Sequence, residues 1–335
     1  MRAPLRVFIV GAWNHRGRHE EFIARAFRQL RARVEGLNPS RHQSVYHRGP
    51  RLFPRLLERR VRRFRPDLVL TAKGRGVPPD LWQSLPGLKV MWYPDYRDPP
   101  DPHILALARA SDCFFLTAFG QIPRYRALGV RRVHFLPQGV DDRMRPPPDP
   151  WPEMRFPVVF LGSGYAYRHR WEVLLAFARR FPLHVFGGGW DRYRCPFPAE
   201  WCLTPEEWQR ARQQIRHRHP PVYNEEYGAV LHRSGIVLGT AVPGVPLYFS
   251  NRVWLTLGWG GFLLQEYEEG LERLLENHRH LVWFRSLEEG LDLADRYLRY
   301  PYERHRIARE GRREVHRRHT YRHRLREMLQ VCGLA

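Results

Sequence analysis

The sequence predicts an α/β protein built from two doubly wound, Rossmann-like domains. Its 335 residues suit two domains of ordinary size, and short apolar runs alternate with longer segments of helical periodicity. Strands that alternate with helices form parallel sheets covered by helices on both faces. Residues 145–156 hold five prolines, which continue neither a helix nor a central strand, so this stretch is the expected linker.

The first domain is expected to span residues 1–144. A β-branched run at residues 5–10 ends at Gly11 and is followed by a helical pattern at residues 19–34. Further short strands are predicted at residues 67–71, 88–93, 113–117 and 133–136, most of them closed by Gly, Pro or Asp.

The second domain is expected to span residues 157–310. Strands are predicted at residues 157–161, 183–186, 236–238 and 261–264, with a helix at residues 171–180. The chain then ends in a charged helix, predicted over residues 304–329. Two such domains place ligands at the carboxyl ends of their strands.

The net charge of +22 is concentrated at the two ends of the sequence. Residues 1–66 contain 17 arginines and 4 glutamates, and residues 296–326 contain 12 arginines and 3 glutamates, whereas the middle is almost neutral. Coding bias explains arginine in place of lysine but not the excess over acid. Since arginine suits bidentate phosphate contacts, we expect a polyanionic partner: nucleic acid first, and an anionic envelope polymer or membrane surface second. A solvated basic surface is the alternative.

Other classes of protein find little support. No apolar run approaches the length of a membrane helix, and the first ten residues do not resemble a secretory signal, so we expect a cytoplasmic protein. The four cysteines form no CxxC pair and are expected to be reduced thiols. Neither His217 and His219 nor Cys195 and Cys202 have the spacing of a typical zinc site, so no metal is expected.

Two residues of the first domain are candidate general bases. His15 lies in the glycine-bearing loop after the first strand, and Asp95 follows the predicted strand at residues 88–93. An exposed loop histidine and a turn-capping aspartate are the structural alternatives.

Three loops of the second domain are candidate ligand-binding loops. The first and the last of them suit a phosphate, and the three glycines of the middle one indicate close approach by a ligand or by a neighbouring loop. Gly162-Ser163-Gly164 leads to Arg168, and Gly187-Gly188-Gly189 follows the next strand. Ser250-Asn251-Arg252 stands at a predicted helix start, where backbone N–H groups can meet a diphosphate. No GKS or GKT follows the first loop, which argues against a Walker ATPase, and plain tight turns remain the alternative for the glycines.

The second half of the chain resembles the CgeB-like (spore-maturation type) glycosyltransferases. The resemblance runs over residues 160–328 in five ordered segments. They are Phe160-Leu161-Gly162 with Arg168, Val185-Phe186-Gly187 with Gly189-Trp190, residues 223–239, residues 250–264, and His319-Thr320-Tyr321 with His323-Arg324-Leu325.

This resemblance implies a GT-B fold, with two domains facing across a cleft and a basic C-terminal helix, residues 311–335, packing back on the first domain. It implies metal-independent transfer from a nucleotide sugar, most simply a UDP-sugar, with no other cofactor. Gly162, Ser163 and Arg168 would meet the donor diphosphate, with Gly187, Gly188, Ser250, Asn251 and Arg252 beside it.

One position departs from the family pattern. A glutamate that often binds the donor ribose is replaced here by Leu255. Either Glu266 or a backbone group substitutes, or the donor differs, or activity has been lost.

Three functions are therefore compatible with the sequence. The first is glycosyl transfer to a hydroxyl of a polyanionic acceptor, such as a hydroxylated base of DNA or RNA, with an anionic cell-envelope polysaccharide as the other acceptor. The second is nucleic-acid binding on a degenerate transferase scaffold. The third is another nucleotide-dependent enzyme of similar fold, such as an epimerase.

Overall fold

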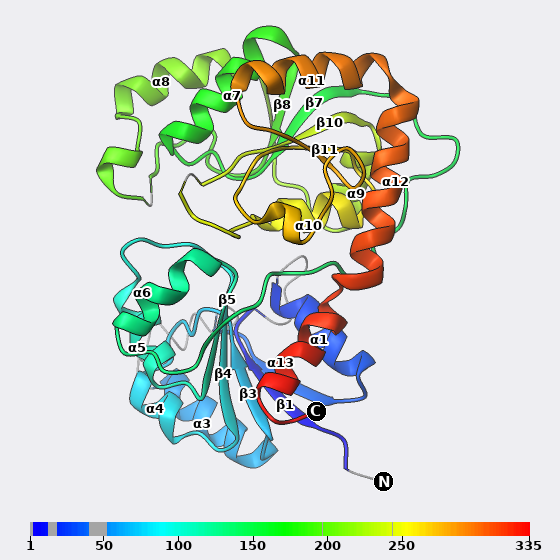
Figure 1. Cartoon of the computed structure of the whole chain (residues 1–335). Coiled ribbons are helices and arrows are strands. Elements are labelled where there is room, and N and C mark those ends of the chain that lie inside the picture. The colour runs from blue at the N-terminus through cyan, green and yellow to red at the C-terminus, as the bar shows by residue number, and fades with distance from the viewer. Residues whose placement is uncertain (1–2, 13–18, 40–51, 196, 243) are drawn as a thin grey trace. The chain divides into compact units, whose positions relative to one another are not determined.

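The computed structural model describes residues 3–12, 19–39, 52–195, 197–242 and 244–335, which form two units (Figure 1). The first unit contains the chain up to Gln138 together with Tyr321–Ala335, and the second contains Gly139–Thr320. Each unit has its own six-stranded sheet in which all strand pairs are parallel. The predicted α/β class is confirmed.

The sheet of the first unit has the order β2-β1-β3-β4-β5-β6. Its strands are β1 (Arg6–Val10), β2 (Arg33–Leu37), β3 (Leu68–Thr71), β4 (Leu88–Tyr93), β5 (Cys113–Leu116) and β6 (Val133–Phe135). One face packs against α3 (Leu52–Phe64), α4 (Pro79–Ser84), α5 (Pro102–Arg109) and α6 (Ile122–Ala127), through a core that includes Phe8, Phe53, Trp82 and Tyr125.

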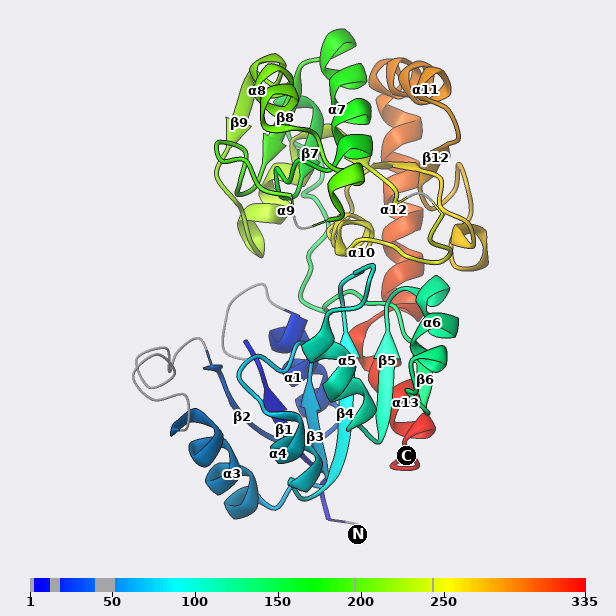
Figure 2. The same cartoon turned by 90° about the vertical axis from the view of Figure 1, so that its left-hand side faces the viewer.

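The other face of this sheet carries α1 (His19–Gln29) and α13 (Tyr321–Val331), which lie side by side (Figures 1 and 2). His19 Nδ1 lies 3.1 Å from the Tyr321 hydroxyl, and both rings contact the buried Trp92. The last helix of the chain therefore belongs to the core of the first unit.

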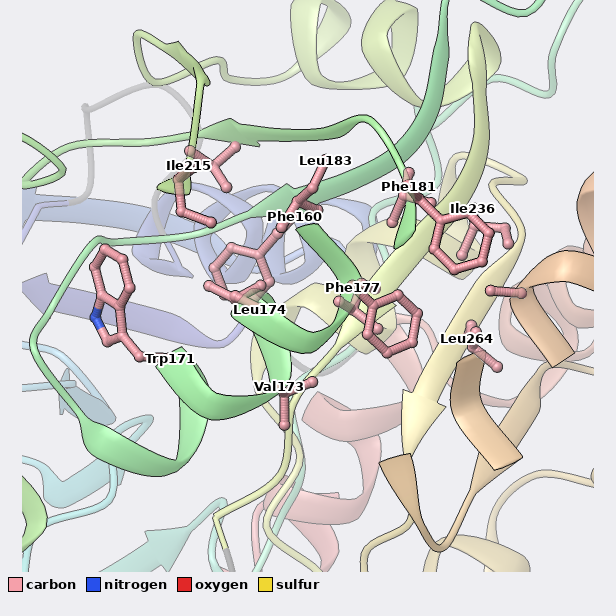
Figure 3. Packing of buried hydrophobic residues seen from close by; sticks show 14 of the residues in the cluster. Phe160, Trp171, Val173, Leu174, Phe177, Phe181, Leu183, Ile215, Ile236 and Leu264 are labelled. Carbon is pink, nitrogen blue, oxygen red and sulfur yellow. The ribbon is translucent and has the colours of Figure 1, made fainter. Parts of the chain in front are cut away.

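The sheet of the second unit has the order β12-β11-β10-β7-β8-β9. Its strands are β7 (Phe156–Leu161), β8 (Leu183–Phe186), β9 (His217–His219), β10 (Ser234–Gly239), β11 (Leu263–Glu266) and β12 (Val282–Phe284). Helices α7 (Arg168–Arg180), α8 (Pro205–Gln214) and α11 (Leu287–Arg299) share one core with one face of this sheet, and Phe160, Trp171 and Phe177 lie in it (Figure 3). The remaining helices are α9 (Glu225–His232), α10 (Asn251–Gly258) and α12 (Pro301–Arg318).

The prediction of a single C-terminal helix over residues 304–329 is wrong, because the structure has two helices there. α12 ends at Arg318, and α13 begins at Tyr321. Between them, Thr320 pairs with Val140 as an isolated parallel bridge, and the His319 carbonyl accepts a hydrogen bond of 2.9 Å from Val140 N. Because this backbone pairing replaces helical bonds, α12 belongs to the second unit and α13 to the first.

The prediction that all four cysteines are reduced thiols is also corrected. Cys195 and Cys202 form a disulfide, with Cα atoms 6.0 Å apart. Ala166 holds the segments of both cysteines, since its N–H donates to the Arg194 carbonyl at 2.9 Å and its carbonyl accepts a hydrogen bond of 2.8 Å from Leu203 N. A search for CxxC spacing could not detect two cysteines that a longer loop brings together. No helix in the described ranges is long and apolar enough to span a bilayer.

Two adjacent glycines give a matched test of loop packing. A Cβ on Gly187 would lie 1.9 Å from the Gly162 carbonyl oxygen, whereas a Cβ on Gly188 would meet nothing within 4 Å. We expect Gly187→Ala to destabilise the protein by about 1–3 kcal/mol, because backbone must move, and Gly188→Ala to be nearly neutral. Denaturant unfolding of both variants measures this; equal stabilities would contradict the described loop contact.

The buried His19 predicts acid sensitivity. Burial, with a smaller contribution from Lys73, lowers the pKa of His19 to about 3, below its ordinary 6.5. The unfolded chain therefore binds this proton first, and stability is lost as pH falls below 6.5. The loss amounts to at most about 1.4 kcal/mol per pH unit. Urea unfolding measures the free energy of unfolding between pH 7 and 4. This free energy should decline less steeply with falling pH in His19→Gln than in the native chain, and parallel declines would refute the assignment.

Candidate functional site

Polar and glycine-bearing loops meet at the carboxyl edge of the second sheet. The loops follow β7, β8, β10 and β11, which are neighbours in the strand order. In doubly wound parallel sheets this edge is where ligands bind. It holds most of the donor-site residues predicted from the sequence.

The two glycine loops are bonded to each other. Gly162 N donates to the Phe186 carbonyl at 2.8 Å, and Gly164 N donates to the Gly188 carbonyl at 3.0 Å. A side chain on Gly164 would collide with the backbone of Trp190. Gly162, Gly164 and Gly187 thus satisfy close loop packing, whereas a Cβ on Gly188 would face open space.

Arg252 is a buried cation at this edge. It lies in the first turn of α10, is only 7% exposed, and donates through Nε to the Leu161 carbonyl at 2.8 Å. Its guanidinium carbon lies 4.0 Å from the ring centroid of Phe160. A Cβ at Gly162 would lie 2.8 Å from Arg252 Nη2, so this glycine makes room for the guanidinium.

Arg170 brings a second cation to the same ring. Its guanidinium carbon lies 5.5 Å from the Phe160 centroid, and Nη1 donates to the Ser163 carbonyl at 3.0 Å. Burial lowers the pKa of Arg170, and burial followed by repulsion from Arg170 lowers the pKa of Arg252 to about 10. Both groups remain positive at neutral pH.

Little in the protein compensates these two charges. Among the described residues, neither guanidinium makes an ion pair, and Arg252 Nη1 and Arg170 Nε are buried with no hydrogen-bond partner. The nearby Glu268 is buried as well, and burial raises the pKa of its carboxyl group well above its usual value. Arg252 is buried and Arg170 is half-buried, and two guanidinium groups without a carboxylate partner among the described residues suit a bound diphosphate.

Arg168, the arginine that the sequence favoured, is engaged elsewhere. Nη1 and Nη2 contact the two carboxylate oxygens of Glu207 at 3.0 and 2.7 Å, and Nη2 also donates to the Cys202 carbonyl. Glu207 completes the capping box of α8 with Thr204. The pair ties α7 to α8, which suits a structural role for Arg168.

Arg170 was missed by sequence reasoning. The segment Arg168-His169-Arg170 offered two arginines, and only the first matched the family pattern. Residues two apart on a helix point to different sides, so only one of them could face the glycine loop. The side on which each lies depends on where α7 begins.

Glu266, the suggested substitute for the missing ribose carboxylate, already has partners. One carboxylate oxygen lies 2.7 Å from His169 Nε2, and the other accepts a 2.8 Å hydrogen bond from Ala241 N. The hydrogen bond between Glu266 and His169 raises the pKa of His169. Glu266 thus joins β11 to α7 and to the loop after β10.

The polar triplet Ser250-Asn251-Arg252 at the start of α10 has mixed surroundings. Ser250 occupies the N-cap position but makes no side-chain cap bond. The Asn251 Oδ1 atom is buried without a hydrogen-bond partner, which leaves an acceptor available one turn before Leu255. Leu255 is half-buried and brings no polar group.

The candidate bases lie in the first unit. Asp95 follows the carboxyl end of β4 and is partly exposed, with Oδ2 2.5 Å from Lys73 Nζ. His15 lies outside the described residues. No group of three or more metal-ligating side chains occurs among the residues that the structure places.

Residues 166–330 match the family described as "Glycosyl transferase-like". This stretch, just under half of the chain, is therefore similar to a glycosyl transferase-like domain. The match spans α7 to α13 and so includes Arg168, Arg170 and Arg252. No curated protein sequence matches the chain.

Solved structures with the same architecture span almost the whole chain. Anabaena HepE in complex with UDP-glucose is 11% identical, with 99% of this chain and 100% of that chain covered and a TM-score of 0.68. Sucrose-phosphate synthase from Thermosynechococcus elongatus is 13% identical over 98% of both chains, with a TM-score of 0.65. An alpha-glucosyltransferase in complex with UDP and a 13-mer DNA containing an HMU base is 11% identical, with 99% and 100% covered and a TM-score of 0.68. The predicted GT-B fold is confirmed.

The arginine pair predicts anion binding that is independent of any sugar. Inorganic pyrophosphate should raise the Tm of the native protein, because it supplies acceptors for Arg170 and Arg252. Arg252→Met should abolish this shift while leaving the ligand-free Tm equal or higher, since an unpaired buried charge is removed. Arg168→Met is the matched control and should keep the rise in Tm. Loss of this rise in Arg168→Met, with the rise retained in Arg252→Met, would contradict the assignment.

Proposed function

We propose that the protein is a glycosyltransferase that moves a sugar from a UDP-sugar to a hydroxyl group of a polyanionic acceptor, nucleic acid in the first instance. The observation that carries the proposal is the pair of guanidinium groups at the carboxyl edge of the second sheet, the buried Arg252 and the half-buried Arg170, neither of which makes an ion pair among the described residues. HepE, which binds UDP-glucose on a similar fold, supports the choice of donor.

In the proposed reaction an acceptor hydroxyl oxygen forms a bond to the anomeric carbon, and the bond from that carbon to the diphosphate oxygen breaks. UDP leaves with the bonding electron pair. Arg170 and Arg252 stabilise the negative charge that develops on it, as preorganised donors do in other active sites. We propose that these two cations make a metal unnecessary and that the hydroxyl proton passes to Asp95 or His15.

Around the leaving group we propose three further contributions. The two glycine loops, which hold Gly162 and Ser163 after β7 and Gly187 and Gly188 after β8, surround the diphosphate. Gly188 is the position that a ligand can approach. Ser250 and the start of α10 offer N–H groups to it. Asn251 Oδ1 accepts a hydrogen bond from a ribose hydroxyl and so replaces the carboxylate that the family has at the position of Leu255. Glu266 does not take this role, because its two carboxylate oxygens already contact His169 and Ala241.

The acceptor is inferred from charge. The arginine excess lies in residues 1–66 and 296–326, and a structurally similar alpha-glucosyltransferase binds DNA containing an HMU base. We therefore place the reaction in the cytoplasm, where nucleic acids and nucleotide sugars are both present. The CgeB-like subtype is proposed on the five segments described above.

One observation favours a second candidate. Leu255 removes the carboxylate expected for the donor ribose, which suits a nucleic-acid-binding protein that has lost transferase activity. Such a protein would bind nucleic acid normally in Arg252→Met and would release no UDP from any UDP-sugar.

The test is UDP release from UDP-sugars in the presence of hydroxymethylated DNA, unmodified DNA, or an anionic polysaccharide. Removing one preorganised cation should lower kcat/KM by about 10²–10³-fold in Arg170→Met and Arg252→Met. Arg168→Met should change it far less, because that side chain is paired with Glu207. UDP release without any acceptor would indicate a hydrolase, conversion of one UDP-sugar into another without UDP release would indicate an epimerase, and full activity of both arginine variants would overturn the proposal.

A further inference from the structure

Helix α3 of the first unit carries a dense arginine surface. Arg55, Arg59, Arg60, Arg62 and Arg63 lie on this helix, Arg65 follows it directly, and all six side chains are exposed. We call these six residues, with the neighbouring Arg6, the α3 arginine surface. Glu58 is the one acid on the helix, and it pairs with Arg62 at 3.0 Å. Within the part of the chain that the structure describes, Arg55, Arg59, Arg60, Arg63 and Arg65 make no ion pair.

The surface is hollowed where α3 ends. Arg6, Arg62, Arg63 and Arg65 line an open depression of about 620 Å³ that has no carboxylate in its wall. Arg6 donates hydrogen bonds to the carbonyl groups of Phe64 and Arg65, which holds its guanidinium against the end of the helix. The guanidinium carbon of Arg6 also lies 4.7 Å from the Phe64 ring centroid. Part of this positive surface is therefore fixed in position.

Helix stability does not explain the whole arrangement. Cations near a helix C-terminus interact favourably with the helix dipole, and this accounts for Arg62 and Arg63. Arg55 lies close to the N-terminus of α3, where a cation is unfavourable and where no acid occurs in the first turn. Arg59 and Arg60 lie between the two ends and gain little from either.

The apolar side of α3 is already used. Phe53, Leu57, Val61 and Phe64 are buried in the core of the first unit. A helix that lies in a membrane interface needs a free apolar face to insert, and α3 has only Leu52 exposed among its large apolar residues. The surface therefore favours a partner that is recognised by charge alone.

The α3 arginine surface lies away from the carboxyl edge of its sheet. Arg6 is the first residue of β1, and Arg65 comes three residues before β3, so both lie at the amino ends of the strands. Asp95 follows the opposite end of β4. An acceptor held at the carboxyl edge would contact this surface only if it were a long polymer.

We propose that the α3 arginine surface binds the phosphate backbone of a nucleic acid. Arginine forks match phosphate oxygens in pairs, and backbone contacts of this kind orient a polymer without reading its sequence. The inference rests on the proposed function in one respect, since it says where that function's polyanionic acceptor docks. Binding is measured without any nucleotide sugar, so its failure leaves the transferase proposal standing.

The test is fluorescence anisotropy of a labelled 20-base-pair DNA duplex, titrated with the full chain between 50 and 200 mM salt. Each lost phosphate contact should make the slope of log Kobs against log salt shallower by about 0.9. The triple variant Arg59→Ser, Arg60→Ser, Arg63→Ser should therefore lose more than one unit of slope and at least tenfold in affinity at low salt.

The matched control removes the same charge elsewhere. Arg179, Arg210 and Arg216 are exposed and line a second basic depression in the second unit. The control triple Arg179→Ser, Arg210→Ser, Arg216→Ser should keep most of the native slope. Equal losses of salt slope and DNA affinity in the two triple variants would show a response to net charge alone. Unchanged DNA binding in the α3 triple variant would show that DNA binds to another surface. Either result overturns the proposal.

A second arm distinguishes a lipid phosphate from a nucleic acid. Vesicles of phosphatidylcholine with phosphatidylserine are sedimented with the native protein and with both triple variants. We expect no α3-dependent binding to them. Vesicle binding that the α3 triple abolishes, together with unchanged DNA binding, would assign the surface to a membrane and overturn the proposal.

Discussion

Two like charges held against one aromatic ring dominate the carboxyl edge of the second sheet. Arg170 and Arg252 both lie over Phe160, and neither has a carboxylate partner among the described residues. Such an arrangement costs free energy, because the two cations repel each other and burial removes water from Arg252. The neighbouring loops are built around it. Gly162 has no side chain that would displace Arg252, and the carbonyl groups of Leu161 and Ser163 accept hydrogen bonds from the two guanidinium groups.

The remaining ionisable groups near this edge serve the scaffold. Glu207 binds Arg168, and Glu266 binds His169 and Ala241, so these acids are unavailable to neutralise the central pair. Glu268 is buried, and its raised pKa favours the neutral acid. The positive charge is thus left for a ligand. A leaving diphosphate is the group in glycosyl transfer that needs it, which connects the electrostatics of the site to the proposed chemistry.

Much of the fold and part of the site could be predicted from sequence. Apolar runs predicted β7, β8, β10 and β11, whose carboxyl ends form the candidate site, and the polar triplet at the start of α10 included Arg252. The edge strands β2, β9 and β12 were not predicted. The three residues of β9, His-Arg-His, carry no apolar signal, and β2 overlaps the end of the helix predicted over residues 19–34, whereas α1 ends at Gln29. The break between α12 and α13 escaped because it depends on a backbone pairing with the distant Val140. Arg168 and Arg170 could not be distinguished without the rotation of α7, which tertiary packing of Trp171 and Phe177 determines.

The most direct measurement compares the affinities of UDP and uridine by titration calorimetry in the native protein and in Arg170→Met and Arg252→Met. The ratio of the two dissociation constants isolates what the diphosphate contributes. The account predicts a strong native preference for UDP that falls at least tenfold in each variant, with uridine affinity unchanged. A preference for UDP that survives in both variants would contradict the claim that these arginines hold the donor diphosphate.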